Sequence, residues 1–116
     1  MKKIIVLLSF FCLLSCSESV ETNPKETVTD GQKVFNADGC NACHTIGGPK
    51  LIGPDLKGVA SRRDTEWLKS WITNSSELIA SGDKDAVALF KEFNNSPMAA
   101  YNLSQAEMNS LLDYLK

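Results

Sequence analysis

The 116-residue sequence predicts an all-α fold on three observations. A stripe of apolar residues with the spacing of one helix face lies near the carboxyl terminus. This stripe consists of Met108, Leu111, Leu112 and Leu115. Residues 67–72 carry a second stripe of the same period, and no alternation typical of a β-strand surrounds the two cysteines at positions 40 and 43. The folded part of the chain is therefore expected to consist of helices joined by loops.

A first helix is expected within residues 29–39, because Thr29 and Asp30 can both cap a helix amino terminus. Phe35 would lie on its inner side. Gly31 is costly near the start of a helix unless another backbone approaches closely. The glycine therefore indicates that another backbone approaches this helix closely.

A Cys-x-x-Cys-His run follows at residues 40–44. In such a run the two thiols form thioether bonds to the porphyrin of a c-type haem, and the adjacent imidazole becomes an axial ligand of the iron. The two intervening residues let both sulfurs reach neighbouring edges of one macrocycle. Cys40 and Cys43 are therefore predicted to attach haem, with His44 as an iron ligand.

Other chemistries of a Cys-x-x-Cys pair are a thioredoxin-like redox centre, half of a zinc site or a structural disulfide. A zinc site needs about four ligands, and His44 is the only histidine in the chain. A thioredoxin-like pair belongs in a βαβ setting, for which there is no strand pattern nearby. Metal or disulfide chemistry remains the alternative to haem.

The segment after His44 is expected to be an ordered loop. Residues 45–58 contain four glycines and two prolines, which rule out a helix. Residues 59–64 are expected to form a short polar connection that contains Arg62 and Arg63. Either guanidinium could pair with a haem propionate, because its geometry matches a carboxylate, but such a pair is also common on a solvated surface.

The middle of the chain predicts two helices. Residues 64–66 open the first, which carries Trp67 and Trp71 on its apolar face. Both tryptophans are expected to pack against the haem wall, and either could donate its indole N–H to a propionate. Residues 74–76 are expected to end this helix, and residues 81–83 to cap the next. The apolar positions of the next helix are Val87, Leu89, Phe90 and Phe93.

Two methionines remain as candidates for the sixth iron ligand once Met1 is lost with the leader. Met108 belongs to the apolar stripe of the last helix, which Ser104 and Glu107 begin with a capping box. Met108 is therefore expected in the core. Met98 lies in a non-helical loop before that helix, where it is either a ligand or a structural loop residue.

Together these features resemble the small class I cytochromes c. In that family a Gly-x-x-x-Phe pair on the first helix crosses a Leu-x-x-Tyr pair on the last. Gly31, Phe35, Leu111 and Tyr114 stand in the matching positions. The resemblance covers residues 29–116 and implies a small cytochrome c fold, with about four helices wrapped around one covalently attached haem c.

The resemblance also implies roles for individual residues. The carbonyl of Pro54 would accept a hydrogen bond from His44 and so orient the imidazole. Leu56 would pack on the haem, and Met98 would be the axial ligand opposite the histidine. One departure is that Pro97 precedes Met98, whereas the common family order is methionine followed by proline. This order predicts a somewhat less stiff loop on the distal side.

The amino terminus predicts secretion and lipidation. Residues 1–15 combine two lysines with a short apolar centre, which is typical of a signal peptide and too short to span a membrane. The run before Cys16 resembles the lipobox of bacterial lipoproteins, so Cys16 is expected to carry lipid; an ordinary secretory signal is the alternative. Residues 16–28 are polar and predict a flexible tether with a span of roughly 20 Å. The domain would face the periplasm from the cell membrane or outer membrane.

Cysteine usage and charge agree with this interpretation. Cys12 would be discarded with the signal peptide, so lipid and haem together account for the other three cysteines. Loss of Lys2 and Lys3 leaves ten basic and fourteen acidic side chains, a formal charge of about −4. No clustered basic excess suggests nucleic-acid binding.

The expected function is that of a membrane-tethered electron carrier rather than an enzyme. Its partners would be redox proteins of a respiratory chain, such as an oxidase, a reductase or a quinol-oxidising complex, with no small-molecule substrate. A haem peroxidase or a gas sensor with an open sixth site is the alternative. Four cations near the haem loop are expected to form a basic rim that docks an acidic partner. They are Lys50, Lys57, Arg62 and Arg63.

Overall fold

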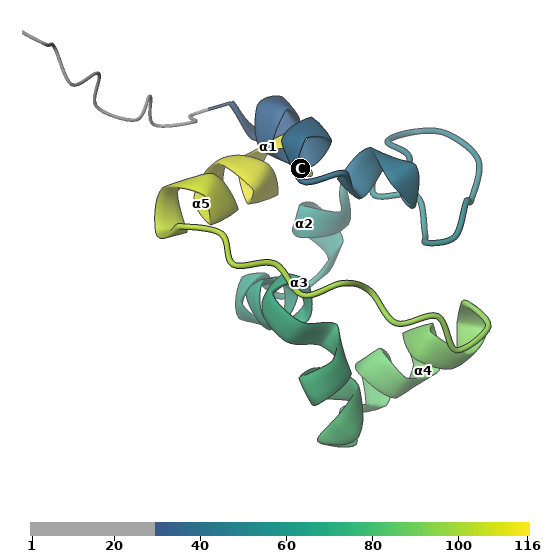
Figure 1. Cartoon of the computed structure of the whole chain (residues 1–116). Coiled ribbons are helices and arrows are strands. Elements are labelled where there is room, and N and C mark those ends of the chain that lie inside the picture. The colour runs from purple at the N-terminus through teal and green to yellow at the C-terminus, as the bar shows by residue number, and fades with distance from the viewer. Residues whose placement is uncertain (1–29) are drawn as a thin grey trace, which may run out of the picture.

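The computed structural model describes residues 30–116, which fold into helices and loops (Figure 1). The elements in chain order are α1 (Gly31–Ala37), the 3-10 turn η1 (Cys40–Ala42), α2 (Val59–Arg62), α3 (Thr65–Ala80), α4 (Lys84–Glu92) and α5 (Gln105–Tyr114). No strand occurs among these residues, so the predicted all-α fold is confirmed. The predicted signal peptide, lipidated cysteine and tether lie outside the described range. Within that range no helix is both long and apolar enough to cross a bilayer.

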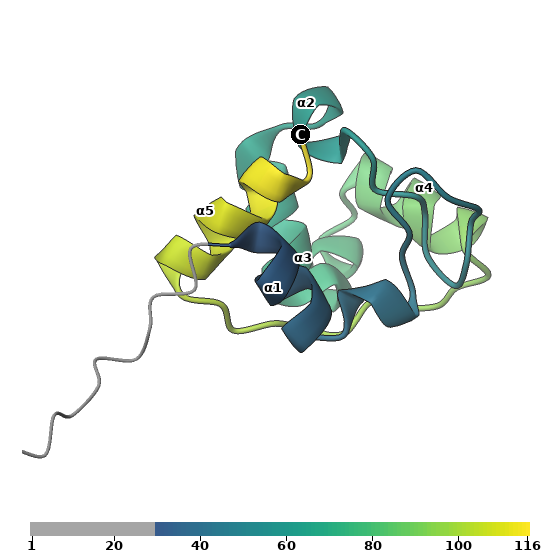
Figure 2. The ribbon, with the colours of Figure 1, turned by 90° about the horizontal axis from the view of Figure 1, so that it is seen from above.

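The first and last helices cross at Gly31, as predicted. A Cβ atom added to Gly31 would lie 2.0 Å from the carbonyl oxygen of Ser110 and 2.6 Å from the Cβ of Tyr114, so no other residue fits. The rings of Phe35 and Tyr114 meet beside the crossing, with centroids 5.8 Å apart. Both views show α1 lying against α5 (Figure 1; Figure 2). The contact joins the two ends of the described domain.

The core lies where α1, α3 and α5 meet. Its buried members are Val34, Phe35, Leu68, Ile72, Met108, Leu111, Leu112 and Leu115. Met108 is 7% exposed, so its predicted place in the core is confirmed. The stripe that predicted α5 is the face that this helix buries. The capping box that begins α5 is also present, since Ser104 and Glu107 cap each other's backbone N–H.

The connection predicted at residues 59–64 contains a helical turn, α2, which the sequence did not indicate. Gly58 leads into the turn with a φ of 65°, which glycine adopts without strain. The backbone N–H of Ala60 donates to the carbonyl of Leu115 at 3.1 Å. A tertiary hydrogen bond therefore fixes this turn, and the local sequence alone does not reveal it.

The break predicted at residues 74–76 is a kink within α3, and the helix continues to Ala80. Asn74 has φ −160° and ψ 83°, outside the helical region. Its side-chain oxygen accepts from the backbone N–H of Glu77 at 3.3 Å, as an N-cap residue does. Asn74 thus ends the first half of α3 and begins the second. The next helix, α4, begins after Asp83, whose carboxylate accepts from Ala86 N–H at 2.8 Å.

The chain after α4 turns back across α3 to reach α5. Asn94 and Asn95 both have a φ of 57°, in the left-handed region that asparagine tolerates better than most residues. The segment from there to Ser104 has no helix or strand. Figure 1 shows it passing α3, and a hydrogen bond of 3.2 Å from Tyr101 N–H to the carbonyl of Ile72 joins the two. The segment thus brings Met98 alongside α3.

Replacing Gly31 with alanine should lower the free energy of unfolding by about 3 kcal/mol, because the clash with the α5 backbone outweighs the helix propensity gained, which is about 1 kcal/mol. Gly82→Ala is the matched control: its φ is 80°, yet nothing lies within 4 Å of the added Cβ. Strain alone should cost this variant about 1 kcal/mol. Denaturant unfolding measures both losses, and equal losses would contradict a close crossing of α1 and α5.

Candidate functional site

A cavity of about 620 Å³ opens between the core helices and the loop after His44. Its lining includes most of the residues predicted to surround a cofactor. These are Cys40, His44, Pro54, Leu56, Arg62, Trp67, Trp71 and Met98. Cys43 lines an adjoining cavity of about 140 Å³, which shares Cys40, His44 and Met98 with the first. The structure therefore places every predicted site residue of residues 30–116 on the wall of one or both of these cavities.

The imidazole of His44 is fixed by the loop that follows it. Its Nδ1 lies 2.8 Å from the carbonyl oxygen of Pro54, in reach of the hydrogen bond that was expected there. Nδ1–H as donor leaves Nε2 free to ligate a metal. Gly53 packs against the same ring, since a Cβ on it would lie 2.4 Å from His44 Cε1. Gly53 also donates its N–H to the carbonyl of Cys43 at 2.8 Å.

Asp55 closes the loop around Pro54. Its carboxylate accepts from the N–H of Gly47 at 2.6 Å and from the Thr45 hydroxyl at 3.3 Å. Partial burial would raise the pKa of the Asp55 carboxyl, but the backbone N–H groups led by Gly47 outweigh it and lower the pKa below its ordinary value. The carboxylate is therefore charged at neutral pH and holds the loop closed.

The comparison with known families decides what kind of site this is. The family profile described as Cytochrome c matches residues 28–116. The chain belongs to the cytochrome c family. No curated protein matches it significantly.

Two solved cytochromes share the fold. The cytochrome c domain of the pp3183 protein from Pseudomonas putida is 33% identical, with a TM-score of 0.64, and the match covers 74% of this chain and 84% of that one. A cytochrome c from Rhodothermus marinus is 27% identical, with a TM-score of 0.66, over 77% of this chain and 73% of that one. The small cytochrome c fold that the sequence predicted is confirmed.

The cytochrome carries one covalent haem c, and the chemistry of the cavity fits that group. Cys40 and Cys43 are free thiols in the structure, so neither is engaged in a disulfide. Burial, followed by the charge of Asp38, raises the pKa of the Cys40 thiol. An imidazole and a thioether line the same space as the two thiols. Within residues 30–116 no group of three or more His, Cys, Asp and Glu side chains is placed to hold a metal ion.

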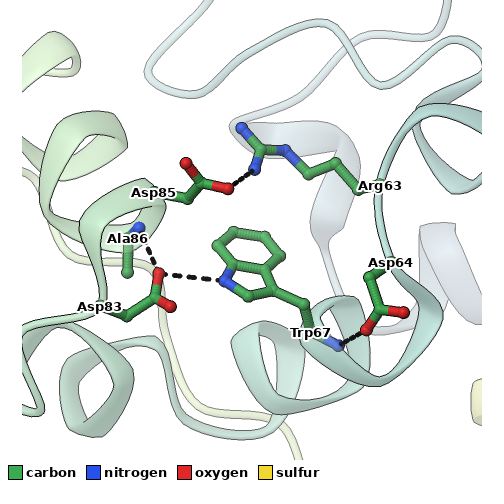
Figure 3. Close-up of polar contacts among 6 residues, drawn as sticks. All are labelled: Arg63, Asp64, Trp67, Asp83, Asp85 and Ala86. Carbon is green, nitrogen blue, oxygen red and sulfur yellow. Dashed lines mark hydrogen bonds and ion pairs between the residues drawn. The ribbon is translucent and has the colours of Figure 1, made fainter.

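The two tryptophans of the cytochrome stack on the cavity wall, with ring centroids 5.2 Å apart and planes 10° from parallel. The indole N–H of Trp67 donates to Asp83 at 3.1 Å, so it is not available to a propionate (Figure 3). The guanidinium of Arg63 lies 4.6 Å from the Trp67 ring centroid and pairs with Asp85 at 3.3 Å. These contacts tie the start of α3 to the start of α4, as Figure 3 shows.

The basic rim expected around the haem loop stays a prediction, but two of its four cations already form ion pairs within this chain. Lys50 pairs with Glu92 at 2.7 Å, and Arg63 is already paired with a carboxylate. Arg62 lines the large cavity and donates to the backbone carbonyl of Lys57. Much of the expected positive charge is therefore balanced locally.

Sequence reasoning missed three contributors to the site. Gly53 could have been suspected, because a glycine before a proline near a ligating histidine often marks a close backbone approach. Asp83 was identified as a helix cap but not as the partner of an indole. Tyr101 lines both cavities, and burial raises the pKa of its hydroxyl. Nothing in the local sequence marks Tyr101 as part of the site.

Asp83 gives the cytochrome an acid-sensitive contact. The N–H of Ala86 and then the indole N–H of Trp67 lower the pKa of the Asp83 carboxyl. Because the carboxyl has a lower pKa in the folded state than in the unfolded state, its ionised form stabilises the fold at pH values above the unfolded-state pKa of about 3.9. This contribution is lost as the pH falls through the folded-state pKa. Wild type should therefore exceed Asp83→Asn in stability at about pH 6, and the difference should shrink below about pH 4. Denaturant titrations across this pH range measure the difference, and a constant difference would rule out the carboxylate as its source.

Proposed function

We propose that this cytochrome is a membrane-tethered carrier that passes single electrons between respiratory-chain partners on the extracytoplasmic side. Haem-based electron transfer follows from its family. The proposal of a carrier, rather than a haem enzyme, rests on one observation. His44 and Met98 line the same two cavities, so both axial positions of one iron can be filled by protein.

Haem c, when bound, supplies a reversible one-electron iron couple, and the chain sets its conditions. Cys40 and Cys43 attach the porphyrin, and His44 is oriented by the Pro54 carbonyl. The Met98 thioether favours ferrous iron and so raises the reduction potential. The stacked tryptophans and the core side chains exclude water from the wall, which disfavours the extra charge of ferric iron. These conditions support a moderately positive potential.

The partners would be an oxidase, a reductase or a quinol-oxidising complex. Electron-transfer encounters of this kind use small, transient interfaces. Charge steering contributes to them, but Lys50 and Arg63 already hold carboxylates of this chain, so those two cations offer a partner less free charge. The charges around the haem loop therefore favour transient contacts with a partner protein over a tight complex.

Tethering is supported by the sequence before the described domain. Residues 1–15 have the pattern of a signal peptide, and the following Cys16 occupies the position that lipoproteins modify. Lipid on Cys16 would place the domain on the cell membrane or the outer membrane, facing the periplasm. The polar residues 16–28 would let the domain reach roughly 20 Å from that surface.

Cys16→Ser should release the protein from the membrane, because lipid attachment needs this thiol. The expected result is holoprotein in the soluble fraction of disrupted cells, with its haem spectrum unchanged. Labelling of cells with a radioactive fatty acid should mark wild type and not Cys16→Ser. Cys12→Ser is the matched control, since Cys12 would be discarded with the leader. Equal membrane retention of all three proteins would rule out the anchor.

Met98→Ala should remove the methionine-to-iron absorption band at the red edge of the oxidised spectrum and lower the reduction potential, because the soft thioether ligand is lost. The reduced variant should bind carbon monoxide rapidly. Met108→Leu is the matched control, since it replaces a core methionine at nearly constant volume and should cost less than about 1.5 kcal/mol. An oxidised wild type without this band, or rapid carbon monoxide binding by reduced wild type, would favour the peroxidase or gas-sensor alternative.

A further inference from the structure

The segment that carries Met98 is attached to α3 through a buried serine. Ser75 is 0% exposed and is the buried polar residue of the core within residues 30–116. Its hydroxyl donates to the backbone carbonyl of Met98 at 3.1 Å. A hydroxyl in such a place needs a partner, because an unpaired polar group in the core is costly. Here that partner belongs to the residue proposed as iron ligand.

The kink at Asn74 lies between the two residues of α3 that contact the segment. Asn74 departs from helical geometry, and the Ile72 carbonyl accepts from the N–H of Tyr101 at 3.2 Å. The kink therefore presents a carbonyl and a hydroxyl of α3 to the crossing segment. Together the two hydrogen bonds hold the segment on both sides of residues 99 and 100 and form a clamp.

The segment has little regular structure of its own to hold Met98 in place. It begins after two left-handed asparagines, and Pro97 has no backbone N–H to donate. No helix or strand is assigned between α4 and α5. Its position over the cavity therefore depends on contacts with other elements, and the clamp from α3 supplies two.

We propose that Ser75 is a positioning residue, whose hydroxyl holds Met98 at the iron and sets how readily another ligand displaces it. The proposal rests on the proposed function, in which Met98 is the axial ligand. When Met98 leaves the iron, the segment can move and its carbonyl can be hydrated. The hydrogen bond from Ser75 is thus strongest in the closed state and stabilises that state against displacement.

Removal of the hydroxyl should make the methionine easier to displace. Ser75→Ala leaves the partly buried Met98 carbonyl without its donor in the closed state, while the displaced state loses little. The affinity of the oxidised holoprotein for added imidazole should therefore increase about tenfold. Titration followed at the methionine-to-iron band measures this affinity. The rate of carbon monoxide binding to the reduced protein should increase as well.

Two further variants separate the hydrogen bond from packing. Ser70→Ala is the matched control: it removes a hydroxyl from the same helix, but this hydroxyl bonds the carbonyl of Glu66 at 3.0 Å and is exposed. It should bind imidazole as wild type does. Ser75→Thr keeps the donor and adds a methyl group, so its affinity should lie closer to wild type than that of Ser75→Ala. If the imidazole affinity of Ser75→Thr increased as much as that of Ser75→Ala or more, the effect would come from packing, and the proposal would be overturned.

A measurement on wild type keeps the proposal testable even where Ser75→Ala yields no holoprotein. Saturating imidazole should increase the amide exchange rate of Tyr101, because displacement of Met98 opens the clamp. An unchanged rate would overturn the proposal. Absence of the methionine-to-iron band from oxidised wild type would overturn the ligand assignment and this inference together. A normal band with equal imidazole affinity in Ser75→Ala and Ser70→Ala would overturn the inference alone.

Discussion

The hydrogen bond between His44 and the Pro54 carbonyl couples the haem-attachment run to the loop that follows it. For this bond to form, the backbone must pass so close to the imidazole that residue 53 can have no side chain. Asp55 then fixes the return of the loop, because its carboxylate accepts hydrogen bonds from the backbone N–H groups of Gly47 and Gly48. Because a ligating imidazole takes its orientation and basicity from the hydrogen bond at its second nitrogen, this loop would set the electronic character of His44 as the proposed proximal ligand.

The distal side of the cavity is built differently, from contacts between elements far apart in the chain. The kink in α3 holds the segment that carries Met98, and the indole of Trp67 joins α3 to the cap of α4. Neither contact is a surface ion pair, whose worth is typically below about 1 kcal/mol. Each satisfies a half-buried or buried polar group, and the loss of such a bond costs about 1–3 kcal/mol. The geometry of the distal side therefore depends on a few hydrogen bonds, and the loss of any one of them would lower the stability appreciably.

Local sequence patterns predicted the structure correctly where a residue type or motif has one main structural or chemical role. Gly31 predicted the helix crossing, the capping box predicted the start of α5, and the Cys-x-x-Cys-His run predicted the cofactor. Pairings over long sequence distances could not be read in this way. The Trp67 indole meets a carboxylate 16 residues away, and Lys50 meets one 42 residues away, so both donors looked free in the sequence. The turn of α2 was missed for the same reason, because a hydrogen bond from its Ala60 N–H to the carbonyl of Leu115, far along the chain, fixes it.

The crossing of α1 and α5 also dictates when the domain can close. Its two partners are the first and the last helices of the described chain, so the contact forms at the cost of ordering nearly everything between them. Contacts of such high sequence separation are slow to form, because the entropy of closing the intervening chain opposes them. In the proposed export from the amino terminus, the two cysteines would emerge before α5. Their thiols would then be accessible to attachment chemistry on an open chain, and the arrival of the last helix would complete the enclosure.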